Sequence, residues 1–253
     1  MENAITIVQN KKEFLPLKNL ELHKIAYVNM GDADASTFVK TLNKYSQVDT
    51  VSAANLDRLI SDLSHYNTVI VGLHASNASP WKSYQFSEKE LVWLYEIART
   101  NRIILTVFSK PYALNDLKSV SNFESILMAY QNSPIAQQTA AQIIFGGLAA
   151  KGKLPVSVGS IFSAGQGVTT AALDRLSYGL PESVGIDSAR LLKIDSIASH
   201  AVSEKMTPGI QLLIARKGKV IYEKYFGYHS YKKTSKVEFN DLYDLASLTK
   251  ILA

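Results

Sequence analysis

The sequence predicts an α/β fold in which a mostly parallel sheet carries helices on both faces, an α/β sandwich, followed by a second part of different character. Over the first part, short runs of β-branched and other apolar residues alternate with segments of helical apolar spacing. The runs are apolar at nearly every position, as is typical of strands buried on both faces of a parallel sheet. A small-residue polar stretch then precedes a helix and two strands, which predicts a partial α+β segment.

The strands of the first part follow from its apolar runs. We expect strands at 4–8, 25–30, 48–51, 68–73, 102–108 and 126–130. Amphipathic helices are expected between them, through 38–45, 56–63 and 88–98, and a long helix of small residues runs from 133 to 150. Helices thus alternate with most of the strands, as the crossover connections between parallel strands require.

Local signals support the helix boundaries. Ser87 precedes Glu90 by three residues, which is the pattern of a capping box at a helix start. Pro134 follows Ser133 near the first turn of the long helix, where the missing N–H of proline costs least. Gly152 is expected to end that helix region.

A domain boundary is predicted in the small, polar stretch that runs from Gly159 to Gly185. We therefore divide the chain into a first domain at 1–160, a linker at 161–185 and a second part at 186–253. In the second part Asp187 is expected to cap a helix. Two strands at 210–215 and 219–226 follow, joined as a hairpin by the turn at 217–218.

Composition excludes several classes of protein. A formal net charge of +5, from 27 basic and 22 acidic residues, without a dense basic stripe argues against a nucleic-acid partner. The chain has no cysteine, so it has no disulfide and no thiolate metal site. We predict no metal and no cofactor. No apolar run reaches the ~18 residues of a membrane-spanning helix, so no transmembrane segment is expected.

Ligands of open α/β sheets bind at the carboxyl ends of the strands. The loop at 31–34 lacks any glycine-rich phosphate motif and is expected to be a turn with a helix cap. The loop at 73–81 is of more interest, because it carries His74 and Trp81. We take both as tentative contacts for a sugar, while a structural role remains the alternative for a single loop histidine.

The segment at 244–253 contains Ser247 and Lys250, three residues apart. On a helix these side chains lie on the same face and within hydrogen-bonding reach. A serine with a neighbouring lysine suits a nucleophile and its base, and backbone N–H groups at a helix start favour a developing oxyanion. Alone, the spacing also occurs by chance on solvated helices.

Residues 4–160 resemble the C-terminal α/β sandwich domain of family three glycoside hydrolases. The resemblance rests on the segments 111–114, 128–130, 137–147 and 152–157. In such β-N-acetylglucosaminidases the catalytic residues lie on a preceding barrel, which these residues do not include. The resemblance therefore implies an accessory domain whose partner is a glycosidase barrel of a longer parent chain.

From Leu180 onward the chain resembles the opening of a serine β-lactamase or penicillin-binding-protein-like hydrolase. The features are the Pro208-Gly209 pair, the hairpin at Gly218 and the segment 245–250. The resemblance implies that Ser247 is acylated by a β-lactam, ester or peptide carbonyl and that Lys250 takes its proton. A lysine serves as such a base only where burial or positive charge lowers its pKa.

Together the resemblances imply a piece of a bifunctional bacterial hydrolase of the periplasm or outer cell envelope, acting on small-molecule or glycan substrates such as cell-wall sugars and inactive or nearly so alone. A glycan-binding or scaffolding module beside a catalytic barrel is the alternative, and a short esterase using Ser247 without partners is a third hypothesis. Because the hairpin of the second part leaves an uncovered edge, we also expect it to pack on residues 1–160 or to form a homo-oligomer.

Overall fold

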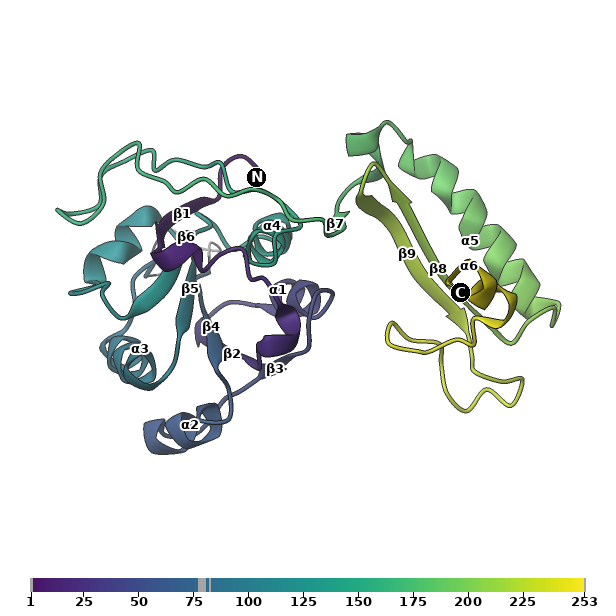
Figure 1. Cartoon of the computed structure of the whole chain (residues 1–253), viewed down its shortest axis with the longest axis horizontal. Helices are drawn as coiled ribbons and strands as arrows, with labels where there is room; N and C mark the ends of the chain where they lie inside the picture. Colours follow the sequence, from purple (N-terminus) through teal and green to yellow (C-terminus); the bar gives the residue numbers. More distant parts are fainter. Residues whose placement is uncertain (1, 77–80, 82, 253) are drawn as a thin grey trace. The chain divides into compact units, whose positions relative to one another are not determined.

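The computed structural model describes residues 2–76, 81 and 83–252. It divides the chain into two compact units, Met1–Arg175 and Leu176–Ala253, each of which is described by itself. The first unit is an α/β sandwich, and the second combines a helix with a small sheet (Figure 1). The predicted fold class is confirmed.

The first unit is built on a six-stranded sheet in the order β1-β6-β5-β4-β2-β3. Five of its strands run parallel, and β1 is antiparallel to β6 at one edge. The strands are β1 (Thr6–Asn10), β2 (Ile25–Gly31), β3 (Val48–Thr50), β4 (Thr68–His74), β5 (Ile103–Phe108) and β6 (Phe123–Met128). The carboxyl ends of the parallel strands therefore meet at one edge of the sheet, as a ligand site of this fold class requires.

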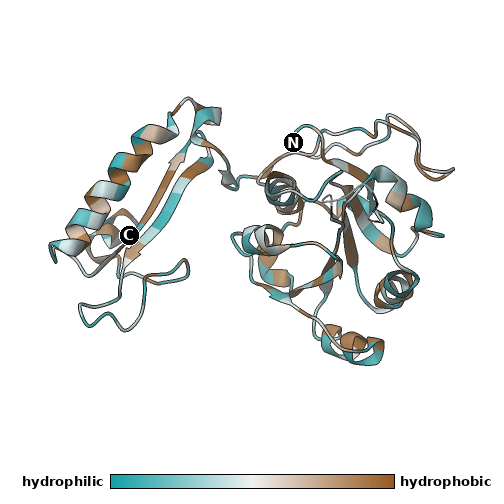
Figure 2. Cartoon of the chain, turned by 180° about the vertical axis from the view of Figure 1, so that it is seen from behind, coloured by the Kyte–Doolittle hydropathy of each residue, from teal (hydrophilic) through white to brown (hydrophobic). Residues whose placement is uncertain are grey.

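Four α-helices cover the two faces of this sheet, and short 3-10 helices lie in its connections. The α-helices are α1 (Ser36–Leu42), α2 (Leu56–Leu63), α3 (Glu88–Thr100) and α4 (Pro134–Ile144), and the 3-10 helices are η1 (Lys11–Glu13), η2 (Leu20–Leu22) and η3 (Pro111–Asp116). Buried residues of α2 and α3 join one apolar cluster, and those of α1 and α4 join the other. Figure 2 shows the apolar strands at the centre of the unit.

The helix starts agree with the sequence, whereas one helix end does not. The Ser87 side chain accepts from the Glu90 N–H and the Glu90 side chain accepts from the Ser87 N–H, so the predicted capping box is present. Pro134 begins α4 as expected. However, α4 ends at Ile144 rather than at Ala150, because Gly146 has a φ of +72°, a left-handed conformation that ends a helix.

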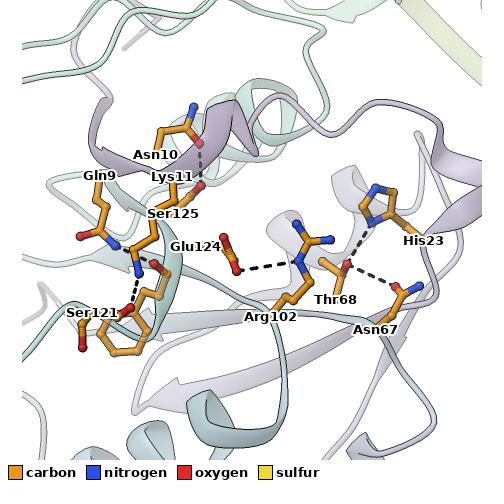
Figure 3. Close-up of polar contacts among 11 residues, drawn as sticks. Gln9, Asn10, Lys11, His23, Asn67, Thr68, Arg102, Ser121, Glu124 and Ser125 are labelled. Atoms are coloured by element: carbon orange, nitrogen blue, oxygen red, sulfur yellow. Dashed lines mark hydrogen bonds and ion pairs between the residues drawn. The ribbon is translucent and has the colours of Figure 1, made fainter.

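Polar contacts hold the amino-terminal segment against the amino ends of the parallel strands (Figure 3). The Ser125 hydroxyl donates to Asn10 Oδ1 at 2.7 Å, and the Gln9 amide donates to the Phe123 carbonyl at 2.6 Å. Nearby, Arg102 forms an ion pair of 3.8 Å with Glu124. These contacts lie at the amino ends of the parallel strands, opposite the carboxyl ends where a ligand is expected. Their role is therefore to stabilise the fold.

The expected linker at 161–185 divides between the two units. Its first part lies against the first unit, since the Val168 N–H donates to the Ile7 carbonyl at 2.7 Å and Arg175 Nη1 donates to the carbonyls of Leu17 and Phe145 at 2.7 and 2.6 Å. Its last part supplies strand β7 (Ser177–Tyr178) to the second unit. The sequence of this stretch has no helical or strand periodicity, but hydrogen bonds to backbone groups hold it in place.

The second unit contains a three-stranded sheet in the order β7-β9-β8 and a long helix. Its further elements are η4 (Pro181–Val184), α5 (Ser188–Ser203), β8 (Gly209–Arg216), β9 (Lys219–Gly227), η5 (Ala246–Leu248) and α6 (Thr249–Leu252). Asp187 caps α5 by accepting from the Ala189 N–H at 2.9 Å. Lys217 and Gly218 have φ values of +52° and +72°, as a two-residue hairpin turn of type I′ requires.

A charged contact fixes α5 to the hairpin. Lys224 Nζ donates to both carboxylate oxygens of Asp195, at 2.8 and 2.7 Å, and the Tyr222 hydroxyl donates to the same carboxylate at 2.7 Å. The hydrogen bond from Lys224 lowers the pKa of Asp195, while burial raises the pKa of Tyr222 to about 12. The Asp195 carboxylate thus joins α5 to Tyr222 and Lys224, whose side chains lie on the same face of β9 because they are two residues apart.

Candidate functional site

The structure brings Ser247 and Lys250 together. Ser247 lies in η5 and Lys250 lies in α6, so the two short helices follow each other without a break. Lys250 Nζ donates to Ser247 Oγ at 3.3 Å. The spacing in the sequence therefore becomes a direct contact between a hydroxyl and an amine, which is the geometry that a nucleophile and its base need.

A tight turn places Ser247 at the start of this helical segment. The Asp244 carboxylate accepts from the Ala246 N–H at 2.9 Å, and Ala246 has a φ of +44°. A residue other than glycine in this conformation stores strain of roughly 1–3 kcal/mol. The Asp244 contact offsets part of this strain. Ser247 and Lys250 are both exposed.

The chain between β9 and this segment is held by its own polar contacts. His229 Nε2 lies 2.7 Å from Asp241 Oδ2, and the same oxygen accepts from the Glu238 N–H at 2.7 Å. Gln211 of β8 donates to the carbonyls of Glu238 and Phe239 at 3.0 and 2.9 Å. This arrangement could not be predicted from the sequence, because His229, Gln211 and Asp241 are well separated along the chain and belong to no recognised motif.

His74, the first tentative sugar contact, is fully buried, with an exposed fraction of 0%. Its ring stacks on Phe108 with 4.2 Å between the ring centroids and also lies against Phe38 and Tyr27. Strand β4 runs through His74, so this residue is the last of the strand and not part of a loop. The structure thus places the His74 side chain in the core between the sheet and α1.

The buried histidine belongs to a polar network. Asn132 Oδ1 accepts from Gln137 Nε2 at 2.7 Å and lies 2.9 Å from His74 Nδ1, so Nδ1 carries the proton. Asn132 and Gln137 also both donate to the Asp34 carbonyl, at 3.0 and 2.7 Å. The network joins His74, at the end of β4, to the segments that follow β2 and β6, and it gives His74 a structural role at this edge of the sheet.

The charge state of His74 follows from this environment. Burial lowers its pKa to about 4, and the hydrogen bond with Asn132 and the charge of Asp34 oppose this effect only in part. Among the residues that the structure describes, His74 Nε2 is buried without a hydrogen-bond partner. The imidazole is therefore neutral at physiological pH.

Trp81, the second tentative contact, is highly exposed, at 92%. It belongs to the predicted loop at 73–81, of which residues 77–80 lie outside the described part of the chain. The structure therefore does not bring His74 and Trp81 together at one accessible surface: one side chain lies in the core and the other in solvent.

The crevice between β2 and β4, where the strand order reverses, is closed by backbone contacts. The N–H groups of Asp32 and Ala33 both donate to the His74 carbonyl, at 3.1 and 3.0 Å, and the Asp32 carboxylate accepts from the Ser76 N–H at 3.0 Å. Ligands of this fold class bind at such a reversal. Here the position is filled by the protein itself.

A pocket of about 290 Å³ lies beside this crevice, at the ends of β2 and β3. Its lining includes Asn29, Ser52, Lys89 and Trp93 above buried apolar residues of β2 and α2. Because β3 pairs with β2 only as far as Tyr27, the outer edge of β2 is uncovered by a strand at this pocket. Trp93, one of the two tryptophans of the chain, lies within the helical pattern of α3, so its position in the sequence does not mark it as a pocket residue.

In the described residues, no group of three or more metal-ligating side chains of the His, Asp and Glu type is found. None of the helices described is long and apolar enough to cross a membrane.

Comparison with known proteins gives different results for the two units. Residues 194–253 match the family model of the β-lactamases, and this range includes both Ser247 and Lys250. A search of curated proteins gave no match.

The first unit is similar to solved glycosidase structures. A fungal multi-domain GH3 β-N-acetylglucosaminidase has a TM-score of 0.53 and 19% identity, over 64% of this chain and 19% of that one. A β-glucoside phosphorylase bound to 2FGlc has a TM-score of 0.50 and 21% identity, over 62% of this chain and 30% of that one. A GH3 exo-β-xylosidase has a TM-score of 0.50 and 10% identity, over 71% and 32%.

The chain spans less than a third of the length of each of these glycosidases. At these identities the likeness concerns the fold of the sandwich. The chain thus joins a unit with the α/β sandwich fold of GH3 glycosidases to a segment that matches the family model of the β-lactamases.

Proposed function

We propose that the chain is part of a bifunctional bacterial hydrolase. The first unit is the accessory sandwich of a β-N-acetylglucosaminidase-type glycosidase, whose catalytic barrel is not among these residues. The second unit carries the nucleophile of a serine hydrolase of the β-lactamase or esterase type. The contact of 3.3 Å between Lys250 Nζ and Ser247 Oγ carries this proposal, together with the family match over the same residues.

The reaction begins with attack of Ser247 Oγ on the carbonyl carbon of a β-lactam, ester or amide. Lys250, in its neutral form, accepts the hydroxyl proton as the new C–O bond forms. Collapse of the tetrahedral adduct breaks the bond to the leaving nitrogen or oxygen, which takes up a proton, and leaves an acyl-serine. Water then releases the acyl group. Resemblance places the groups that assist these steps downstream of Lys250, so we propose little or no turnover by this chain alone.

Intact-mass spectrometry tests the proposal most directly. The chain is incubated separately with a penicillin and with a fluorophosphonate, beside Ser247→Ala and the control Ser235→Ala, which removes an exposed hydroxyl of the same unit. We expect one adduct per chain in the wild type and in the control, and none in Ser247→Ala. An adduct that survives in Ser247→Ala, or no adduct with either reagent at high concentration, contradicts a competent nucleophile.

A glycan-binding role is the second candidate. The exposed Trp81 and the pocket at Trp93 support it, because aromatic rings pack on the apolar faces of sugars and both lie on the side of the carboxyl strand ends. Titration with oligosaccharides of N-acetylglucosamine, followed by tryptophan fluorescence, tests it. Saturable binding that is lost in Trp81→Ala or Trp93→Ala supports the role, and a flat titration argues against it.

The same proposal places the parent in the periplasm or outer cell envelope, where cell-wall sugars occur. It also keeps the expectation that the second unit packs on the first or pairs with another copy. Cell fractionation of the parent tests the location. Sedimentation equilibrium of this chain, with hydrogen exchange of residues 186–253, tests the association, and a monomer with a freely exchanging second unit contradicts it.

A further inference from the structure

The strap, as we call residues 228–241, joins the end of β9 to the segment that carries Ser247. It is fastened to the sheet near its two ends, at Tyr228 and at residues 237–239. The Val237 N–H donates to the Gly227 carbonyl at 3.2 Å, and a Cβ atom on Gly209 of β8 would lie 2.4 Å from the Val237 side chain. The contact of His229 with Asp241 then closes the strap on itself, so that its two ends meet.

Within the described part of the chain, the segment after Asp241 has no recorded hydrogen bond to the rest of the unit. From Leu242 to Ile251, the hydrogen bonds that the structure records stay within the segment: Asp244 with Ala246, Leu245 with Leu248, and Ser247 with Lys250. Helices as short as η5 and α6 do not hold their own conformation in water. The last hydrogen-bonded anchor before Ser247 is therefore Asp241, and Leu242 and Tyr243 after it line a pocket with Pro208 and Gly209.

Besides the bond from the Asp241 N–H to the Glu238 carbonyl at 3.3 Å, the anchor rests on one carboxylate oxygen. Asp241 Oδ2 accepts from the His229 imidazole and from the Glu238 N–H, both at 2.7 Å. These two hydrogen bonds lower the pKa of Asp241, the bond from the backbone contributing more, so the carboxylate is ionised at neutral pH. Carboxylates that accept two hydrogen bonds at this distance are held more firmly than neutral acceptors.

We propose that Asp241, with His229 as its partner, is a positioning residue that holds Ser247 within reach of Lys250. The inference rests on the proposed function, because it concerns the same nucleophile. Asp241 touches neither Ser247 nor substrate in this role. It sets the point from which the nucleophile segment leaves the strap, and a displacement of about 1 Å in such a segment costs up to about 100-fold in rate.

The absence of cysteine in the chain allows a test that needs no substrate. Ser247→Cys introduces a single thiol beside the Lys250 ammonium, and a neighbouring cation lowers the pKa of a thiol. The rate of alkylation by iodoacetamide, measured against pH, reports this pKa. We expect it to lie about 1 below that of the same thiol in a Lys250→Gln background.

The strap variants are then compared in the Ser247→Cys background. We expect Asp241→Ala and His229→Ala to return most of the thiol pKa to the Lys250→Gln value, and Asp241→Asn, which keeps an acceptor oxygen, to retain part of the difference. His200→Gln, an exposed histidine of α5, serves as the control and should change nothing. Circular dichroism confirms that the helix and hairpin remain folded, and Asp241→Asn and His229→Ala keep the test valid if Asp241→Ala does not fold.

Two outcomes overturn the inference: a thiol pKa that does not respond to Lys250→Gln, or one that responds to Lys250→Gln but not to the strap variants. Fluorophosphonate labelling separates this result from the proposed function. We expect Asp241→Ala to slow labelling of Ser247 by about 10-fold or more. A thiol pKa that depends on Asp241 in a chain whose serine is never labelled supports the positioning role and refutes the nucleophile.

Discussion

Protonation of His74 should destabilise the first unit in acid. The ordinary pKa of 6.5 falls to about 4 in the folded chain, because the imidazole is buried against Phe38 and Phe108. The unfolded chain therefore binds the proton at a higher pH than the folded chain. The stability that depends on neutral His74 is complete above pH 6.5 and is lost as the pH falls towards 4.

The size of the effect follows from the difference between the two pKa values. One pKa unit corresponds to about 1.4 kcal/mol, so the change from 6.5 to about 4 corresponds to about 3 kcal/mol of unfolding free energy. His23 has a pKa lowered by burial and by Arg102, which adds a smaller contribution of the same sign. The contribution of His74 must therefore be measured as the difference in unfolding free energy between the wild type and a His74 variant.

Urea unfolding between pH 7 and pH 4 gives this difference. Tryptophan fluorescence reports on the first unit alone, because Trp81 and Trp93 are the two tryptophans of the chain. His74→Gln should be less stable than the wild type at pH 7, and its further loss by pH 4 should be smaller by about 3 kcal/mol. His65→Gln, at an exposed position, is the control and should keep the wild-type pH dependence.

Equal losses in the wild type and in His74→Gln between pH 7 and pH 4 would refute the reasoning. They would mean that the folded chain accommodates the imidazolium without cost, through either water or a shift of Asn132. Burial and stacking of the His74 ring would then not determine its charge state.

Two further substitutions test the packing around this edge of the sheet. A Cβ atom on Gly72 would lie 2.6 Å from His74 Nε2 and 2.9 Å from the Tyr27 hydroxyl, so Gly72→Ala should cost about 1–3 kcal/mol of unfolding free energy. The cost should shrink in a His74→Ala background, and an unchanged cost would show that the clash lies elsewhere. Ser87→Ala removes the capping box of α3 and should cost about 1 kcal/mol in the same urea assay. Ser61→Ala, an exposed serine within α2, is its control, and an equal effect of both changes would contradict a specific role of the cap.

The strands of the first unit could be predicted because their apolar runs are buried on both faces. The structure extends the expected strand at 68–73 by one residue, to His74, and this single residue decides the role of the histidine. As a loop residue His74 would meet solvent, whereas as a strand end it faces the helices. Room for its ring comes from the missing side chain of Gly72, a packing relation that periodicity does not express.

The limits of the first unit were harder to predict for a related reason. Residues 161–175 have the composition of a linker, and nothing in their spacing indicates a partner. Their order comes from bonds with distant backbone groups, such as the bond from Val168 to Ile7, and from the two carbonyls that Arg175 reaches. By contrast, the contact between Ser247 and Lys250 was accessible from sequence, because it depends on helical spacing alone.

The reactivity of Ser247 depends on whether the apolar side chains beside it are exposed to water. Leu248 is 59% exposed and Ile251 is 80% exposed, so the apolar face next to the nucleophile is in water. Water screens the interaction between a hydroxyl and an ammonium, and it stabilises the charged form of a lysine, which cannot accept a proton. Any segment or partner that covers Leu248 and Ile251 also removes water from the neighbouring amine. We therefore expect coverage of this face to speed acylation of Ser247 beyond the rate of the exposed pair, which by itself forms an adduct but does not turn over.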